Sequence, residues 1–176
     1  MAIPLLLASA VLGTLVYEHT EQVLYKKAGV LKPPVGNIID KDFKPINGTV
    51  VCCGIYEKLT HTGIWLNDGI VELAGNGLIR TVSPQRFLSE RSGQVIYGLG
   101  DANKAPLASA DVAKRASVRL FSYEEYHVIT NNCHQFVARC FPSDMDKKIT
   151  LFNELNLLLV DFYQQPLYFY PFVNKM

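Results

Sequence analysis

The chain carries no excess of charge of either sign, which argues against a protein that binds nucleic acid. Its 176 residues include 17 Lys and Arg against 16 Asp and Glu, for a net charge of +1. The basic residues are scattered, with Lys26-Lys27 and Lys147-Lys148 as the adjacent lysines. A surface that binds DNA or RNA needs a concentrated basic patch, so we expect no nucleic-acid partner.

The sequence also lacks the motifs that hold phosphates, nucleotides and metal ions. It has no P-loop, no glycine-rich fingerprint after a strand, and neither the Cys-x-x-Cys nor the Cys/His spacing of a zinc site. It has no internal repeat either. We therefore expect a single globular domain that uses no metal and no other cofactor.

Cysteine is scarce, and its placement does not suggest a disulfide framework. Cys52 and Cys53 are adjacent in a β-rich run, where neighbouring side chains point to opposite faces of a sheet. We expect these two and Cys140 to be inert, buried thiols. Cys133 differs from these three because it follows two asparagines at the predicted start of a helix.

Apolar sequence is abundant: 49% of the residues are hydrophobic, and both ends of the chain are rich in them. The segment 1–32 contains the uncharged stretch Ala2–Tyr17. This stretch is expected to be helical, and three interpretations stay open: a membrane-associated helix, a signal sequence, or a helix docked on the domain. A central segment, 33–145, follows it.

The C-terminal segment, 146–176, is expected to hold an apolar helix over Leu151–Tyr163 and then an aromatic tail. The tail, Leu167–Phe172, combines tyrosine, phenylalanine and proline. Such rings suit a membrane interface or a pocket wall, and a cover over the sheet is an equal alternative.

The most informative motif is Asn131-Asn132-Cys133-His134-Gln135-Phe136-Val137. The apolar spacing after Cys133 predicts an amphipathic helix that begins near this cysteine. Free N–H groups and the positive end of the helix dipole favour a thiolate there. Asn132 is expected to shape the turn as a cap or to contribute to an oxyanion site. His134 is expected to face solvent or to stand behind the site.

A second motif, upstream, supplies an imidazole. The runs His61–Leu66 and Ile70–Leu73 flank Asn67-Asp68-Gly69, which predicts a β-hairpin. On such a hairpin Glu72 can lie across from His61 and accept a hydrogen bond from one ring nitrogen. The other nitrogen is then free to take the thiol proton, which gives a nucleophile, a base and an orienting carboxylate.

These two motifs, over roughly residues 45–141, resemble the lecithin:retinol acyltransferase-like branch of the NlpC-type papain-like superfamily. In that branch the histidine strand precedes the cysteine helix, the reverse of the order in papain. The resemblance implies a permuted papain-like fold of the α+β class: a small antiparallel sheet packed against the cysteine helix. It also implies Cys133 as nucleophile and His61 as general base. Animal acyltransferases of the branch carry a second histidine where this chain has Glu72, whereas some bacterial members carry a glutamate.

Three functions follow as expectations. The first is a phospholipase or acyltransferase that forms a thioester on Cys133 at a lipid or membrane surface, in a membrane-associated or secreted protein, with a cytoplasmic-side location also open. The second is a peptidoglycan or isopeptide amidase, which would need a polar groove that binds carboxylates. The third is a binding protein whose site has lost activity.

Overall fold

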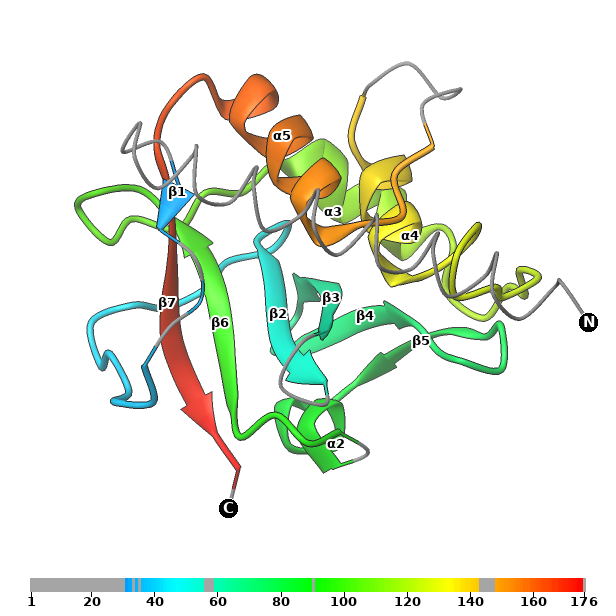
Figure 1. Ribbon diagram of the computed structural model, residues 1–176, viewed down its shortest axis with the longest axis horizontal. Coiled ribbons are helices and arrows are strands. Elements are labelled where there is room, and N and C mark those ends of the chain that lie inside the picture. The colour runs from blue at the N-terminus through cyan, green and yellow to red at the C-terminus, as the bar shows by residue number, and fades with distance from the viewer. Residues whose placement is uncertain are drawn as a thin grey trace, which may run out of the picture.

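A seven-stranded sheet with helices on both faces makes up the computed structural model, which describes residues 31–32, 34, 36–55, 59–89, 91–142 and 148–175 (Figure 1). The strands lie in the order β1-β7-β6-β2-β3-β4-β5. All neighbours pair antiparallel except β1 and β7, which are parallel. The expected α+β class is therefore confirmed.

The strands and the described helices have the following bounds. The strands are β1 (Leu31–Lys32), β2 (Val50–Ile55), β3 (Leu59–Leu66), β4 (Gly69–Leu73), β5 (Ile79–Val82), β6 (Val95–Gly100) and β7 (Leu167–Asn174). The helices are α2 (Pro84–Ser89), α3 (Ala110–Ser117), α4 (Cys133–Cys140) and α5 (Phe152–Tyr163).

The predicted hairpin is β3–β4, and its turn sits one residue earlier than an Asp-Gly turn would. Asn67 and Asp68 both adopt positive φ, at 50° and 60°, as a two-residue type I′ turn requires. Gly69 instead begins β4 and pairs with Leu66. A Cβ on Gly69 would lie 2.8 Å from the Thr81 hydroxyl oxygen, so glycine is needed there for close approach of β5.

The stretch 80–96 holds the end of β5, the helix α2 and the start of β6. Pro84 opens α2, where its fixed φ and missing N–H cost nothing. The Ser83 hydroxyl accepts a hydrogen bond from the Arg86 N–H at 3.3 Å and caps the helix.

Two hydrophobic clusters cover the two faces of the sheet. The larger lies between the sheet and α3, α4 and α5, which gather on one side in Figure 1. The smaller lies on the opposite face beneath α2, with Phe87 and Leu88 at its centre. Cys52 belongs to the first cluster and Cys53 to the second, and all four cysteines are free and buried. The absence of a disulfide framework is therefore confirmed.

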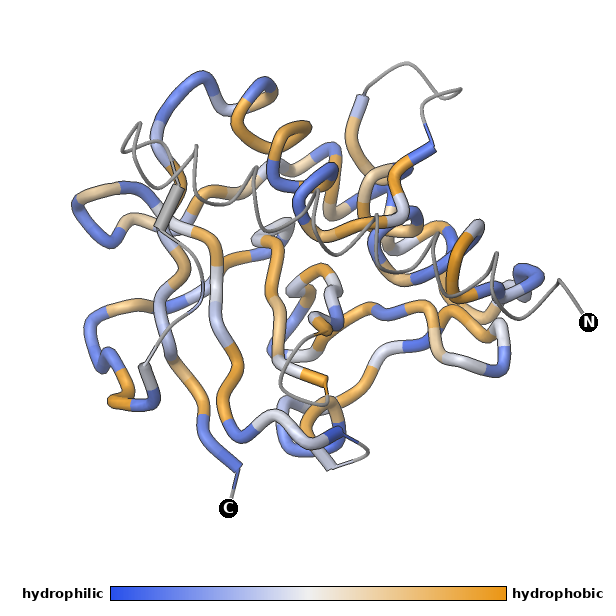
Figure 2. The backbone as a smooth tube through the Cα atoms, in the orientation of Figure 1, coloured by the Kyte–Doolittle hydropathy of each residue, from blue (hydrophilic) through white to orange (hydrophobic). Residues whose placement is uncertain are grey.

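The aromatic tail is part of the sheet. Residues 167–174 form β7, which pairs with β6 through partners such as Phe169 and Leu99. Leu167 and Phe169 are buried, whereas Tyr168 and Tyr170 between them are half-buried. Figure 2 shows the same mixture along β7, whereas β2 at the middle of the sheet is almost wholly apolar. The tail is therefore a strand of the sheet. Of the expected alternatives, a cover over the sheet is the one nearest to this arrangement.

The segment Ala2–Tyr17 lies outside the described residues. Within those that the structure does describe, no helix has the length and apolar character needed to cross a bilayer. The predicted C-terminal helix is confirmed as α5, which packs against α4 through the ring of Phe141. That ring lies 4.9 Å from the ring of Phe162, in an edge-on arrangement.

We expect Phe141→Ala to lower the free energy of unfolding by about 3–5 kcal/mol, because it removes a fully buried ring between α4 and α5. Phe121→Ala is the matched control, since that ring is 76% exposed, and it should change stability by less than about 0.5 kcal/mol. Urea denaturation followed by circular dichroism measures both. Equal effects would mean that α5 contributes little to the stability of the domain.

Candidate active site

Cys133 is the first residue of α4, and Asn132 fixes the helix at this point. The Asn132 side-chain oxygen accepts hydrogen bonds from the backbone N–H groups of His134 (3.0 Å) and Gln135 (3.3 Å). Its amide nitrogen donates to the carbonyl oxygens of Val128 (2.9 Å) and Thr150 (2.8 Å). Both amide hydrogens are thus in use, so Asn132 shapes the turn and has no donor left for an oxyanion.

The backbone N–H of Cys133 is the donor that remains. It has no acceptor among the described residues, as the first N–H groups of a helix have no intrahelical partner. Together with the helix dipole it makes the site beside the sulfur favourable for a developing negative charge.

His61 and Glu72 meet across the β3–β4 hairpin. The His61 Nε2 lies 2.8 Å from the Glu72 Oε2, and both side chains are buried. Because Nε2 is engaged by Glu72, Nδ1 is the ring nitrogen left for Cys133. The predicted orienting contact between the carboxylate and the imidazole is present in the structure.

Glu72 has two further partners that the sequence did not reveal. Its Oε1 accepts from the Arg80 Nε at 2.9 Å, and its Oε2 accepts from the Arg91 Nη2 at 2.7 Å. Arg91 also lies over the ring of Phe87, at 4.8 Å from the centroid. Arg80 is the register partner of Glu72 between β4 and β5. A hairpin prediction for these strands could have found Arg80, whereas Arg91 lies beyond α2 and no local pattern points to it.

The carboxylate therefore has three cationic or potentially cationic neighbours around it. Burial by itself would raise the pKa of Glu72, but the hydrogen bond from His61 and the charges of His61 and Arg91 outweigh it and lower that pKa to about 2. Glu72 is ionised throughout the neutral range, so the hydrogen-bond acceptor for His61 is permanent.

At Cys133 and His61, too, the effects of nearby charges and hydrogen bonds outweigh that of burial, and they favour a thiolate paired with an imidazolium. Burial would lower the pKa of His61, but the charge and hydrogen bonding of Cys133, with the bond to Glu72, raise it overall. Burial would raise the pKa of Cys133, but the nearby charges of His134 and His61 bring it well below the usual thiol range.

The other three thiols show the opposite shift. Burial raises the pKa of Cys53 and of Cys140 to about 12, and it raises that of Cys52 well above the ordinary value. They match the inert thiols expected for these positions. Cys133 is the one cysteine of the chain whose surroundings favour the nucleophilic form.

His134 is buried directly beside the sulfur, so neither of its two expected placements, in solvent or behind the site, is found. Its Nδ1 lies 4.0 Å from the Cys133 Sγ and 3.1 Å from the Thr62 Oγ1. Thr62 points toward α4, whereas its neighbour His61 points toward α2, where the Phe87 ring lies 5.0 Å away. The sulfur thus lies near two imidazoles that come from different elements.

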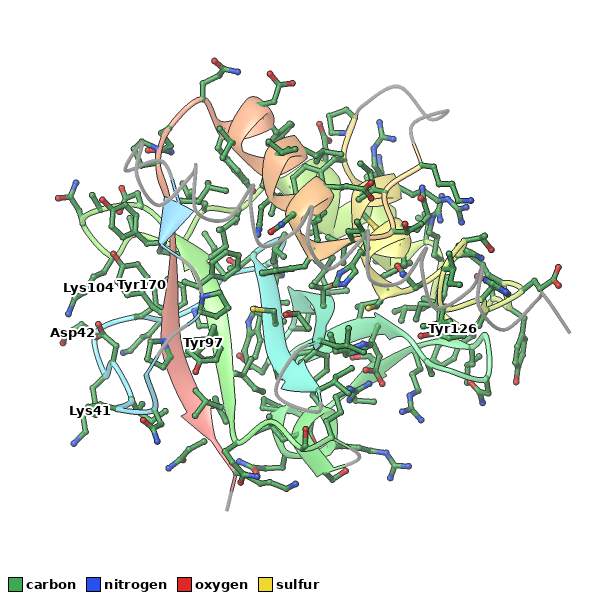
Figure 3. The ribbon with its side chains drawn as sticks, viewed as in Figure 1. Lys41, Asp42, Tyr97, Lys104, Tyr126 and Tyr170 are labelled. Atoms are coloured by element: carbon green, nitrogen blue, oxygen red, sulfur yellow. The ribbon has the colours of Figure 1, made fainter. Side chains whose placement is uncertain are left out.

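A pocket of about 160 Å³ opens beside these residues. His61, Cys133 and His134 lie along it, with Asn132 and with Tyr126, which is labelled in Figure 3 on the loop before α4. The rest of its lining consists of five apolar side chains, those of Ile55, Leu59, Val128, Leu151 and Phe152, and of two threonines, Thr60 and Thr150. Within the described part of the chain no three His, Cys, Asp or Glu side chains are grouped to hold a metal ion.

Comparisons with protein-family models, with curated protein sequences and with solved structures gave no match to this chain.

We expect Glu72→Gln to lower the free energy of unfolding by about 3 kcal/mol at pH 7, since it leaves two partly buried guanidinium groups and the buried His61 without their anion. The folded pKa of about 2 lies below the reference value of 4.5. The stabilisation is therefore complete above about pH 4.5 and is lost as the pH falls toward 2. The difference between wild type and variant should shrink across that window.

Urea titrations at several pH values measure this difference. Glu125→Gln, at an exposed position, is the matched control and should track the wild type at every pH. A gap between wild type and Glu72→Gln that stays constant from pH 5 to pH 2 would show that the charge of Glu72 does not stabilise the fold.

Proposed function

We propose that this chain is a thiol-dependent acyl hydrolase or acyltransferase that acts on acyl esters through a thioester on Cys133. The proposal rests on the cysteine at the start of α4 and on the His61–Glu72 pair, 2.8 Å apart, on the preceding hairpin. This order of histidine strand and cysteine helix is that of the acyltransferase-like branch described above. We propose accordingly that the sheet and α4 correspond to a permuted papain-like fold.

Each step of the reaction has a group to carry it. The Cys133 thiolate attacks the ester carbonyl carbon, and the Cys133 backbone N–H donates to the oxyanion. As the carbon–oxygen bond breaks, the imidazolium of His61 gives its Nδ1 proton to the leaving alcohol. Water or a second alcohol then attacks the thioester, His61 takes its proton, and the carbon–sulfur bond breaks to restore the thiolate.

The observation that favours an acyl ester over a peptide substrate is the lining of the pocket. Among its described lining residues there is no lysine and no arginine. The guanidinium groups of Arg80 and Arg91 are bound to Glu72. A peptidoglycan amidase has to bind the carboxylates of its substrate, and this pocket offers them neither a lysine nor an arginine. The apolar side chains of its lining suit a hydrocarbon chain instead.

The likeness to lipid-modifying enzymes also implies a lipid surface as partner. The aromatic tail no longer supports this, since it is a strand of the sheet. The support comes from the mouth of the pocket, where Leu59 and Val128 are 52% and 62% exposed and Ile129 beside them is 54% exposed. Such side chains gain free energy when they enter the boundary of a bilayer.

We expect the full chain, incubated with phosphatidylcholine vesicles and quenched in acid, to carry one acyl group on Cys133 by intact mass. Cys133→Ala should show no adduct, and His61→Ala should lose at least about a thousandfold in turnover. The double variant should be hardly worse than either single variant, because members of one catalytic unit are not additive.

Cys140→Ala is the matched control, since it makes the same change in the same helix at an inert thiol, and it should keep the adduct. Turnover that persists in Cys133→Ala would overturn the thiol mechanism. Hydrolysis of muramyl peptides but not of phospholipid would replace the acyl ester by the amidase alternative.

A further inference from the structure

The second imidazole at the nucleophile, His134, has no part in the reaction described so far. It follows Cys133 in α4, and only 7% of it is exposed. Its backbone N–H is held by the Asn132 cap, and its ring lies 5.8 Å from the ring of Phe152. The side chain is therefore fixed with Nδ1 toward the Cys133 sulfur, at 4.0 Å.

The two histidines differ in the partner that stands behind each. His61 faces Glu72, an ionised carboxylate that can only accept a hydrogen bond. His134 faces the Thr62 hydroxyl at 3.1 Å, which can donate to a bare Nδ1 or accept from a protonated one. Hence a hydrogen on the His134 Nδ1 lies near both the sulfur and the Thr62 oxygen, and Nδ1 keeps Thr62 as its partner whether or not the sulfur is charged.

We propose that His134 is a second catalytic partner of the Cys133 sulfur, which holds the resting thiolate while His61 moves the proton. This division of tasks rests on the proposed thiol chemistry and adds a role to it. When the thiol ionises, its proton goes to His61, and His134 donates its Nδ1 hydrogen to the sulfur. When the carbon–sulfur bond forms, the sulfur loses its charge, and the Thr62 oxygen, 3.1 Å from the same nitrogen, remains as the acceptor of that hydrogen.

The electrostatic surroundings agree with this arrangement. Burial would raise the pKa of Cys133, and the charge of His134 is the largest effect that opposes it, ahead of that of His61. The other titratable groups within reach of the sulfur are Tyr126 and Cys53. A phenol and a thiol carry no positive charge in either form, and burial raises the pKa of both. Glu72 and Arg91 lie 2.8 Å and 2.9 Å from the Nε2 of His61.

The rate of alkylation of Cys133 by iodoacetamide, measured against pH by intact mass on the full chain, tests the role of His134 without any substrate. The three other thiols are buried with raised pKa values, so a single adduct reports on Cys133. We compare wild type with His134→Asn, whose amide can still bond to Thr62 but cannot donate to the sulfur as an imidazole does. His134→Gln gives the same comparison if asparagine at this position does not fold.

We expect the midpoint of the alkylation profile to rise by roughly one to two pH units in His134→Asn. Ester turnover by this variant should fall about ten- to a hundredfold at pH 6 and recover above the new midpoint, because His61 is intact. Turnover by His61→Asn should not recover at any pH. Thr62→Val, which removes only the hydroxyl partner, should shift the midpoint by less than His134→Asn.

A profile of His134→Asn that superposes on that of the wild type would overturn this role and would leave the thioester mechanism intact. A shifted profile in a protein that turns over no ester would support the role of His134 and overturn the proposed substrate class. The two failures are therefore distinguishable.

Discussion

The carboxylate of Glu72, wholly removed from solvent, is the constraint on which this site depends. An ionised group can lie inside a protein only if hydrogen-bonded countercharges surround it. Glu72 obtains them from β5 through Arg80, from the segment after α2 through Arg91, and from β3 through His61. Three elements are thereby held together around the imidazole that we propose as the base. The orientation of the imidazole and the packing of this end of the sheet thus share one origin.

Local patterns predicted the parts of the molecule that are set by neighbouring residues. A short stretch of sequence was enough to predict each of three elements: the hairpin that carries His61 and Glu72, the helix that begins at Cys133, and the apolar helix α5. The contact between His61 and Glu72 follows from the alternation of side chains along the two strands. The predicted kind of turn is present, but its two central residues are Asn67 and Asp68, one position earlier than in an Asp-Gly turn. Gly69 permits the close approach of β5 and is not a central residue of the turn.

The features that sequence did not predict depend on residues distant in the chain. Arg91 reaches Glu72 only because α2 folds back beneath the sheet, and the opening of α2 at Pro84 was not expected. The place of 167–174 in the sheet is set by pairing with β6, although the alternation of buried Leu167 and Phe169 with half-buried Tyr168 and Tyr170 is a strand pattern that was open to recognition. The proximity of His134 to Thr62 likewise depends on how α4 crosses β3.

The Asn132 amide ties two segments that line the pocket to the helix that carries Cys133. One end of the side chain caps α4, and the other end holds the carbonyls of Val128 and Thr150, two residues of the pocket lining. The pocket cannot widen at this point without also loosening the first turn of α4, whose N–H groups and dipole support the thiolate. Access and reactivity are therefore mechanically coupled. If Cys133 is the nucleophile that we propose, a substrate slender enough to enter between the walls meets a reactive sulfur, whereas one that forces them apart weakens the group that would attack it.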